Sequence, residues 1–508
     1  MISLGILDRS SAAPLHEQLA HGLRAAVLAG RIGGGEVVPS TRALAADLGV
    51  ARGTVVAAYE ILAGEGYLLT RPGGRTVVAE VAHRSPLPPL PRGPASDRAR
   101  VKRSVVDLRP GRPGTTGLAD AAWRSAWRRA TANDPDADVY DPAGTPALRA
   151  EIARHLGRAR GLDVSAADVV VTAGTSDAML LTLLALSPRN GRGSLRVAIE
   201  DPGYPRVRMI LRRLGIEAVP VPVRPGSGLA LDALEKLHGV DAVIVTPHHH
   251  YPLGSRLDAE DRARLLAWAA REDVVVIEDD YDSEFPHGRA PLPPLHLLDP
   301  ARVVLIGSLS KTLTPAVRCG WIVATGDVGA AIRAARDDLD LPVSLVQQHA
   351  LALYIAEGSL ARHTARRRRD YRHRRRLLLE AFTGAAGVEL TATDGGLHAV
   401  AVLPGVVPSG VAHPGAGVDG AGTDGERTSV ERAIVADLDQ RGVRVAPLGS
   451  YAVDADATSL PVGIAFGYAE PSTVALMEAV HAIIDVLRRH AARGASQDEV
   501  THRAIPSR

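Results

Sequence analysis

Five short apolar runs, separated by longer segments of helical pattern, constrain the fold of this chain more than any other feature. Each run is rich in β-branched side chains and ends in polar residues or glycine: DVVVTAG (168–174), LRVAIED (195–201), DAVIVTP (241–247), DVVVIEDD (273–280) and RVVLIGS (302–308). Strands that are apolar on both faces and alternate with helices are typical of a buried, largely parallel sheet. We therefore predict an α/β domain between about residues 105 and 400.

Length and charge limit the kind of protein. A chain of 508 residues is too long for one ordinary core and predicts two or three domains. The net charge of +2 is small, so any contact with nucleic acid must come from a local patch. A single cysteine, Cys319, excludes an internal disulfide framework and is expected to be a small buried hydrophobe. We see no signal peptide or membrane span, and we expect a cytoplasmic protein without a membrane partner.

Changes in composition divide the chain into four parts. Residues 1–80 alternate helical periodicity with short turns, and 81–105 form a linker rich in proline and arginine. Residues 106–490 are predicted to be the main domain, followed by a polar, frayed tail over 491–508. Within the main domain, 403–429 is rich in glycine and proline and is predicted to be a disordered surface insertion.

The first part follows the order helix, helix, tight turn, helix, hairpin. Apolar side chains at 15, 19, 23, 27 and 28 indicate an amphipathic helix over 15–32. Ser40 is a good N-cap for a second helix, Gly49 supplies the turn, and a third helix is expected over about 52–63. YLLTRPGGRTVV (67–78) is typical of two short strands around a turn. Together these elements predict a winged helix-turn-helix.

The third helix of such a domain enters the major groove N-terminus first. The residues expected to meet DNA are Ser40, Arg42, Arg52 and Thr54, with Arg71 and Arg75 on the wing. A three-helix protein-binding module is the alternative. Residues 38–68 resemble the GntR-type winged helix, which implies double-stranded DNA as a partner. Ala51 stands where a serine is usual in that family, and Gly53 loosens the first helical turn by roughly 1 kcal/mol.

Lys311, in GSLSKTLTP (307–315), is one of three lysines in a chain whose basic residues are nearly all arginine. It follows a predicted buried strand and a serine-rich turn. A lysine in such a place can lose its proton through desolvation and act as a nucleophilic amine, whereas an arginine stays charged. The alternative is an ordinary structural lysine, and the neighbouring motifs bear on the choice.

VVVIEDDYDSEF (274–285) brings carboxylates out at the end of a buried strand. Asp279 and Tyr281 share one face of an extended segment. In pyridoxal phosphate sites a carboxylate pairs with the protonated ring nitrogen. Asp279 is a candidate for that role, with the Tyr281 hydroxyl directed at the phenolic oxygen of the ring. A magnesium cluster and plain solvated charge are the alternatives.

A phosphate cradle is predicted where a strand turns into a helix at VTAGTSDAML (171–180). Gly174 permits the turn, and backbone N–H groups follow it at the start of the helix. The groups expected to hold the phosphate are the backbone at Thr175 and Ser176 and the side chains of Ser308 and Arg318.

TPHHHYPLG (246–254) contains three adjacent histidines. Successive side chains diverge in extended structure, so we expect no metal site there. His249 is instead expected to hydrogen-bond the cofactor ring. The arginine-rich run over 365–376 is compatible with nucleic acid. Its helical spacing spreads the charges around the helix, which equally favours a solvated or dimer-facing helix.

Residues 108–480 resemble a fold-type I, aspartate-aminotransferase-like domain, and the whole chain resembles the MocR/GabR family of regulators. The motifs that carry this resemblance are YDPAGTPALRAEIARHLGRARG (140–161), IEDPGYPRVR (199–208), IEDDYDSEF (277–285) and GSLSKTLTPAVRCGW (307–321). The resemblance implies a Schiff base between pyridoxal 5'-phosphate and Lys311. It further implies a phosphate contact from Arg318 and a cofactor contact from Tyr204.

Two positions depart from the family pattern. His250 replaces a glutamine, and LPVGIAFGYA (460–469) lacks the arginine with which amino-acid-binding relatives anchor a carboxylate. Arg206 or Arg444 is a candidate substitute for that arginine. The other possibility is that the ligand is the cofactor itself, and the sequence leaves both open.

The family resemblance implies a head-to-tail homodimer whose winged helices bind promoter half-sites. Pyridoxal phosphate or an amino acid would act as effector by changing domain closure. The missing arginine favours control of vitamin B6 metabolism. One alternative is an active aminotransferase that carries a DNA-binding domain, and the sequence leaves turnover open. Another is a scaffold that has lost its cofactor, against which Lys311, Asp279 and Tyr281 argue.

Overall fold

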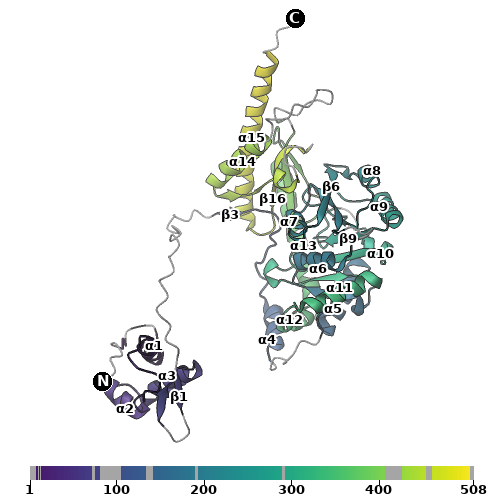
Figure 1. The fold of residues 1–508 in the computed structure, drawn as a ribbon. Helices are drawn as coiled ribbons and strands as arrows, with labels where there is room; N and C mark the ends of the chain where they lie inside the picture. Colours follow the sequence, from purple (N-terminus) through teal and green to yellow (C-terminus); the bar gives the residue numbers. More distant parts are fainter. Residues whose placement is uncertain are drawn as a thin grey trace. The chain divides into compact units, whose positions relative to one another are not determined.

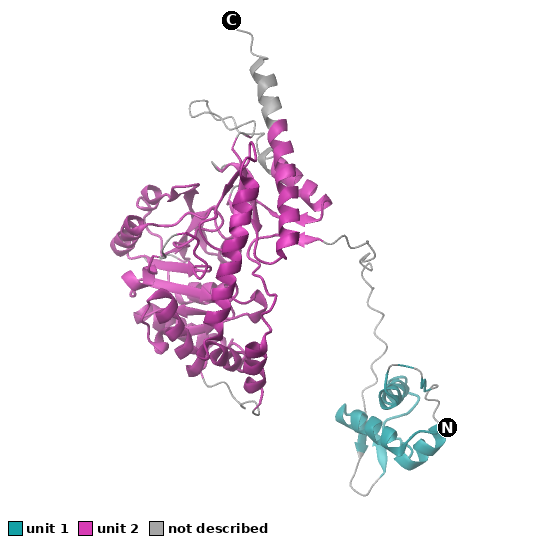
Figure 2. Ribbon diagram, turned by 180° about the vertical axis from the view of Figure 1, so that it is seen from behind, with its two compact units in different colours: residues 1–101 teal, residues 102–508 magenta. Residues whose placement is uncertain are grey.

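The computed structural model describes residues 7–9, 11, 13–70, 75–79, 105–132, 141–188, 193–288, 292–404, 406, 426–453 and 460–503. The chain divides into two compact units, residues 1–101 and 102–508, which Figure 2 shows in different colours. Each unit is described by itself below. Of the predicted linker over 81–105, only Val105 belongs to the described residues.

The first unit is a winged helix-turn-helix, as predicted. Its elements are α1 (Leu15–Leu28), α2 (Thr41–Leu48), α3 (Arg52–Gly64), β1 (Leu68–Thr70) and β2 (Thr76–Val78), the two strands pairing antiparallel. The Ser40 hydroxyl caps α2 by accepting a hydrogen bond from the Ala43 N–H at 3.2 Å. Gly49 ends the helix with a φ of 60°, a left-handed conformation that favours glycine.

Helix α1 is shorter than the sequence pattern suggested. It ends at Leu28, whose side chain is 51% exposed, and Gly30 follows with a positive φ. Leu19 and Leu23 pack with Val55 of α3 in the core of the unit. The last apolar position of the pattern is therefore the last residue of the helix and lies outside the core.

An eight-stranded sheet forms the centre of the second unit (Figure 1). Its spatial order is β4 (Val169–Thr172), β11 (Gly320–Val323), β10 (Val303–Ser308), β9 (Val275–Asp280), β8 (Ala242–Val245), β5 (Arg196–Asp201), β6 (Glu217–Arg224) and β7 (Gly228–Leu229). All five apolar runs of the sequence are strands of this sheet. It is parallel from β10 to β6, whereas β11 and β7 run antiparallel to their neighbours.

Helices cover both faces of this sheet, which explains why its strands are apolar on both sides. One face packs against α6 (Thr175–Ala185), α7 (Pro205–Leu214) and α11 (Gly326–Leu339). The other face packs against α4 (Ala121–Ala130), α5 (Pro146–Arg160), α12 (Leu345–Ala356), α8 (Leu231–Leu234), α9 (Ala259–Glu272) and α10 (Leu295–Leu298). We call the sheet and these helices the large lobe.

A smaller antiparallel sheet and three long helices form what we call the small lobe. The sheet has the order β12 (Glu389–Thr391), β13 (His398–Leu403), β16 (Val462–Gly467) and β15 (Ala446–Pro447). The helices are α13 (Ser359–Phe382), α14 (Glu426–Gln440) and α15 (Thr473–Arg503), and they share one core with the sheet. Beside them, β14 (Val443–Arg444) pairs parallel with β3 (Val106–Asp107).

Two boundaries differ from the sequence analysis. Helix α14 begins at Glu426, inside the segment predicted to be a disordered insertion, and residues 407–425 lie outside the described residues. Helix α15 continues to Arg503, through much of the predicted polar tail, because AARGASQDEV has few helix breakers. Among the described residues, every helix is too short or too polar to cross a membrane.

Candidate functional site

The ends of β9 and β10 and the start of α6 surround one cavity in the large lobe. Asp279 lies opposite Ile306 in the parallel pairing of β9 with β10, so the segments that follow these strands are neighbours. The cavity has a volume of about 200 Å³. Eight residues predicted to bind a cofactor line it: Thr175, Ser176, Tyr204, Asp279, Tyr281, Ser308, Lys311 and Arg318. Open α/β sheets bind ligands at this edge.

Lys311 projects its amine into this cavity from the turn after β10. The amine donates a hydrogen bond to the Gly111 carbonyl at 2.8 Å. Burial lowers the pKa of Lys311, although the charges of Asp282 and Asp279 oppose that effect. Gly111 has a φ of 91°, and a Cβ there would lie 2.8 Å from the lysine nitrogen. The structure thus provides a desolvated amine with space for a small electrophile beside it.

Asp279 carries a buried oxygen that needs a partner. Its Oδ1 makes no hydrogen bond among the described residues. Burial raises the pKa of Asp279 to about 7, and the charge of Asp280 adds to the shift. A buried carboxyl of this kind prefers either a proton or a cationic N–H donor. A protonated ring nitrogen in the cavity would supply that donor.

An anion cradle lies at the N-terminus of α6, in the same cavity as Asp279. Gly174 is its N-cap with a φ of 98°, and a Cβ there would lie 3.8 Å from Ser310 Oγ and 4.0 Å from an Arg318 nitrogen. Gly174 therefore borders the cradle without lining the cavity. The Ser308 hydroxyl accepts from the Ser310 N–H at 2.9 Å, which orients both serines. Helix N–H groups, hydroxyls and a guanidinium form a donor set suited to phosphate.

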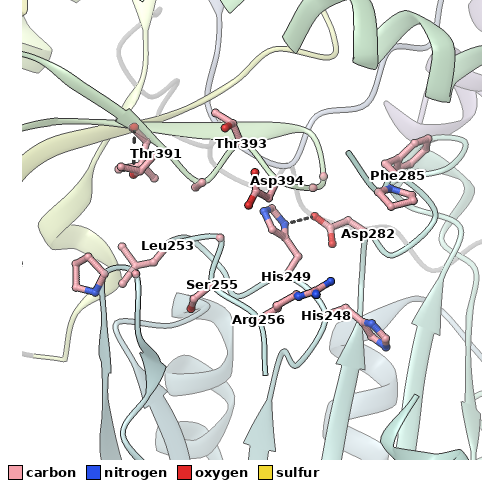
Figure 3. Close-up of a pocket in the computed structure, with 18 of the residues that line it drawn as sticks. His248, His249, Leu253, Ser255, Arg256, Asp282, Phe285, Thr391, Thr393 and Asp394 are labelled. Atoms are coloured by element: carbon pink, nitrogen blue, oxygen red, sulfur yellow. Dashed lines mark hydrogen bonds and ion pairs between the residues drawn. The ribbon is translucent and has the colours of Figure 1, made fainter. Parts of the chain in front are cut away.

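His249 does not line the cofactor cavity, and its predicted contact with the ring stays a prediction without support from this geometry. Its Nδ1–H donates to Asp282 Oδ2 at 2.8 Å and lies 3.0 Å from the Tyr281 hydroxyl oxygen. Figure 3 shows His249 and Asp282 facing each other in a different, larger cavity. The reason is the turn after β8, which directs the histidine behind Tyr281.

The three adjacent histidines diverge, as expected. His248 contacts Arg160 and lies 3.5 Å from Glu278, whereas His250 donates to the Pro202 carbonyl at 3.0 Å. In the described part of the chain, one group of three potential metal ligands exists: His249, Asp282 and His398. Hydrogen bonds already engage these groups, since His398 donates to the Pro252 carbonyl at 2.9 Å. We interpret this group as a hydrogen-bonded cluster.

Several cavity residues escaped the sequence analysis, among them Pro110, Gly111, Thr246, Tyr251, Ser310 and Pro315. Tyr251 donates to the Tyr451 hydroxyl at 3.2 Å and lies edge-on to Tyr204 with ring centroids 5.8 Å apart. Tyr251 belongs to the TPHHHYPLG motif, so it could have been proposed as a site residue from the sequence. Gly111 could not be found in this way, because it meets Lys311 only through a contact between distant segments.

The two candidate effector anchors lie in different places. Arg206, at the start of α7, is exposed, and its charge acts on the Tyr204 hydroxyl, which lines the cavity. Arg444 does not reach the cavity: it lies on β14, exposed, with its Nε 3.9 Å from Asp439. Strand β14 pairs with β3 and turns this side chain to solvent. The residues of β16 are all buried, and none of them is charged.

The predicted DNA-contact residues cluster around the start of α3. Arg42 and Arg52 are exposed, Thr54 is half-buried, and Arg52 Nε lies 3.4 Å from the Thr41 hydroxyl. Ser40 uses its hydroxyl as a helix cap. Of the wing residues, Arg75 is exposed and Arg71 lies outside the described residues.

The N-terminus of α3 lacks a side-chain cap. Ala51 occupies the N-cap position with an extended backbone, and no side-chain hydrogen bond satisfies the first N–H groups of the helix. A Cβ on Gly53 would meet nothing within 4 Å. Both departures from the GntR pattern therefore leave the start of α3 less stable than the fold allows.

The arginine-rich run belongs to α13 and is used inside the protein. Arg374 donates to the carbonyls of Tyr468 and Ala469, and Arg368 donates to the Glu284 carbonyl at 2.9 Å. Arg366 pairs with Asp120 at 3.2 Å. These contacts identify much of the run as structural and argue against a nucleic-acid surface.

Comparison with known proteins covers both units. Residues 15–78 match the family of bacterial regulatory proteins, gntR family, and residues 105–464 match aminotransferase class I and II. The chain is 41% identical over 384 residues to the HTH-type pyridoxine biosynthesis transcriptional regulator PdxR of Corynebacterium glutamicum, covering 75% of this chain and 82% of that protein. It is 33% identical over 416 residues to the probable rhizopine catabolism regulatory protein MocR of Rhizobium meliloti, covering 78% and 83%.

Solved structures agree on the fold. The multiple substrate aminotransferase from Thermococcus profundus matches with a TM-score of 0.65 at 20% identity, covering 77% of this chain and 93% of that one. An archaeal alanine:glyoxylate aminotransferase matches with the same TM-score at 23% identity, covering 77% and 91%. With its GntR-type winged helix-turn-helix joined to an α/β domain of the aminotransferase class I and II fold, the chain belongs to the MocR/PdxR-type family of DNA-binding transcriptional regulators.

Proposed function

We propose that this regulator binds pyridoxal 5'-phosphate covalently through Lys311 and adjusts its binding to DNA according to the supply of vitamin B6. The observation that carries the proposal is one cavity of about 200 Å³ that holds a desolvated amine, a carboxylate oxygen with no hydrogen-bond partner among the described residues and an anion cradle. Aldehyde, pyridine nitrogen and phosphate are the three groups of the cofactor that match them.

Each side chain of the cavity has a role in this proposal. Asp279 would accept the hydrogen bond of the ring nitrogen, and the Tyr281 hydroxyl would meet the phenolic oxygen. Thr175, Ser176, Ser308 and Arg318 would hold the phosphate. When bound, pyridoxal phosphate supplies an electrophilic aldehyde and an electron-accepting ring. Lys311 supplies the nucleophile, because burial leaves a larger neutral fraction of its amine at neutral pH.

The absence of a carboxylate anchor in β16 favours a B6 compound over an amino acid as effector. Every residue of β16 is buried and uncharged, so a ligand carboxylate would find no partner there. Arg206 is the remaining candidate on the cavity side. The relative with 41% identity carries a name that refers to pyridoxine biosynthesis, which supports the same choice.

The proposal includes a head-to-tail homodimer that places two winged helices on separated promoter half-sites. Binding at the cavity would change how the two lobes close and thereby how the two DNA-binding units engage their half-sites. The support for this step is the family resemblance, since half-site recognition by helix-turn-helix dimers depends on spacing.

A DNA-binding assay with and without cofactor tests the proposal. We expect gel shifts at fixed salt to show different affinity or footprint on the cognate promoter when pyridoxal phosphate is present. The Lys311→Arg variant keeps the charge but cannot attack an aldehyde, so it should lose the visible absorption of the bound cofactor and the response. Lys236→Arg, at an exposed lysine, is the matched control. Identical binding in both states would contradict the proposal.

A working aminotransferase is the second candidate, because the amine, the ring carboxylate and Tyr281 are all present in the cavity. An enzyme would bleach its cofactor absorption with an amino donor and recover it with a keto acid. The proposed sensor should show no sustained turnover, since it lacks a strand arginine to anchor both substrates. Steady production of a keto acid over many cycles would favour the enzyme.

A further inference from the structure

A second cavity of about 570 Å³ lies between the large lobe and the small lobe (Figure 3). His249 and Asp282 line it on one side, and residues 391–396, at the end of β12 and in its connection to β13, line it on the other. Tyr281 instead lines the cofactor cavity. The Tyr281 hydroxyl lies 3.0 Å from His249. The hydrogen-bonded group of Tyr281, His249 and Asp282 therefore lies between the two cavities.

The hydrogen bonds of this group assign its protons. Asp282 is buried and accepts from His249 Nδ1–H at 2.8 Å. Because a carboxylate can only accept, that bond places a proton on Nδ1, and Nε2 is buried with no partner among the described residues. The Tyr281 oxygen can then only accept from Nδ1. Its own proton remains available for donation, either to Asp282 or into the cofactor cavity.

The charges around this group keep the Tyr281 hydroxyl protonated. Burial raises the pKa of Tyr281 well above its ordinary value, and the negative charge of Asp282 adds to the shift. His398 of β13 faces the His249 ring with centroids 5.1 Å apart, and burial lowers its pKa to about 3, so it is neutral. Lys311 and Asp279 contribute the remaining nearby charges.

The small lobe holds the pair in place through a glycine. Gly396 adopts a φ of 68°, and a Cβ there would overlap the Asp282 carboxylate and lie 2.9 Å from ring atoms of His249. Its carbonyl accepts from the Tyr468 hydroxyl at 2.8 Å. A residue from outside the large lobe thus closes directly over the two side chains that contact Tyr281.

We propose that His249 and Asp282 form a positioning pair that directs the Tyr281 hydroxyl, as a hydrogen-bond donor, into the cofactor cavity. The inference rests on the proposed function, because the acceptor in the cavity is the phenolic oxygen of pyridoxal phosphate. Neither side chain touches the cofactor; both act through Tyr281. The contact with Gly396 makes the orientation of the pair depend on where the small lobe sits.

Absorption spectroscopy of the full chain loaded with pyridoxal phosphate tests the pair. We would titrate the visible band with pH in the wild-type chain and in His249→Gln, Asp282→Asn and Tyr281→Phe. We expect the two pair variants to shift the midpoint in the same direction as Tyr281→Phe, by about half to one pH unit, the equivalent of one hydrogen bond. His249→Gln should have no further effect in a Tyr281→Phe background.

The controls separate this inference from folding and from the proposed function. Asp394→Asn alters an exposed carboxylate of the same cavity, paired with Arg375 at 3.6 Å, and should leave the midpoint unchanged. Melting temperatures identify any variant that fails to fold, and Asp282→Asn and His249→Gln serve as independent probes. If His249→Gln shifted the titration midpoint equally in the wild-type and Tyr281→Phe backgrounds, the pair would not act through Tyr281 and the inference would be wrong. A wild-type chain without any visible band would overturn the proposed function and this inference with it.

Discussion

The DNA-binding unit and the cofactor cavity use polar residues in opposite ways. Around α3, the arginines are exposed and lie within a short stretch of sequence. In the cavity, Asp279 is buried and Lys311 is half-buried, and they meet Tyr204 and Gly111 from distant segments. Burial changes the chemistry of the second group, shifting the pKa values of both Lys311 and Asp279. Exposure leaves the charges of the first group open to screening by salt.

The largest effect is expected where burial matters most, at Asp279. Asp279→Asn should weaken pyridoxal phosphate binding by about 10- to 100-fold, because a charge-assisted hydrogen bond to the ring nitrogen is lost. Equilibrium titration of the visible band measures this. An unchanged dissociation constant would mean that Asp279 does not face the ring nitrogen.

Asp279→Asn should also change how the stability of the chain depends on pH. The pKa of Asp279 is about 7 in the folded chain against an ordinary 3.8, so its contribution to stability is complete below 3.8 and is lost as pH rises through 7. Asp279 should therefore lower the melting temperature of the cofactor-free chain as pH rises from 5 to 8, whereas the buried His250 and His398, whose pKa values are lowered from 6.5 to about 3, raise it up to about pH 6.5. The difference in melting temperature between the wild-type chain and Asp279→Asn, followed over this pH range, isolates the contribution of Asp279. Burial also raises the pKa of Glu200 to about 7, so the contribution of Glu200 to the pH dependence of the melting temperature should remain in this variant.

A medium effect is expected at the exposed site. Arg52→Ala should weaken DNA binding and reduce the slope of log affinity against log salt by about 0.9, the value for one phosphate contact. Arg24→Ala is the control, because its guanidinium is held by Glu65. If Arg52 reads a base, specificity at one position would relax while the salt slope stayed constant.

The smallest effect concerns the missing helix cap. Ala51→Ser should stabilise the start of α3 by about 0.5 to 1 kcal/mol, because a hydroxyl would accept from a free N–H group. Hydrogen exchange of the α3 amides in the full chain should slow by a few-fold. Ala46→Ser, at an exposed interior position of α2, should bring no such gain. An unchanged exchange rate would show that the N–H groups in the first turn of α3 already have hydrogen-bond partners.

Sequence patterns predicted the elements well where a residue's role is local. Ser40 caps α2, Gly49 ends it, and the five β-branched runs are strands of one sheet. Asp279 and Lys311 were found because Asp279 lies at the end of β9 and Lys311 lies in the turn after β10. Periodicity failed at Leu28, the last residue of α1, which was expected on the apolar face and is 51% exposed.

Positions that depend on contacts between distant segments were missed or misplaced. His249 was expected at the cofactor ring and lies behind Tyr281, where Asp282 holds it. Arg444 was a candidate anchor and faces solvent, because β14 pairs with a strand from the start of the domain. No local pattern encodes either outcome.

The sequence by itself determined the two kinds of fold, the order of their elements and the residue types at the strand ends, since these follow from periodicity, capping and hydrophobicity over short distances. The tertiary structure decided which of those residues share a cavity and which are desolvated. Burial depends on what packs from elsewhere in the chain, and it is burial that lowers the pKa of Lys311 and raises that of Asp279.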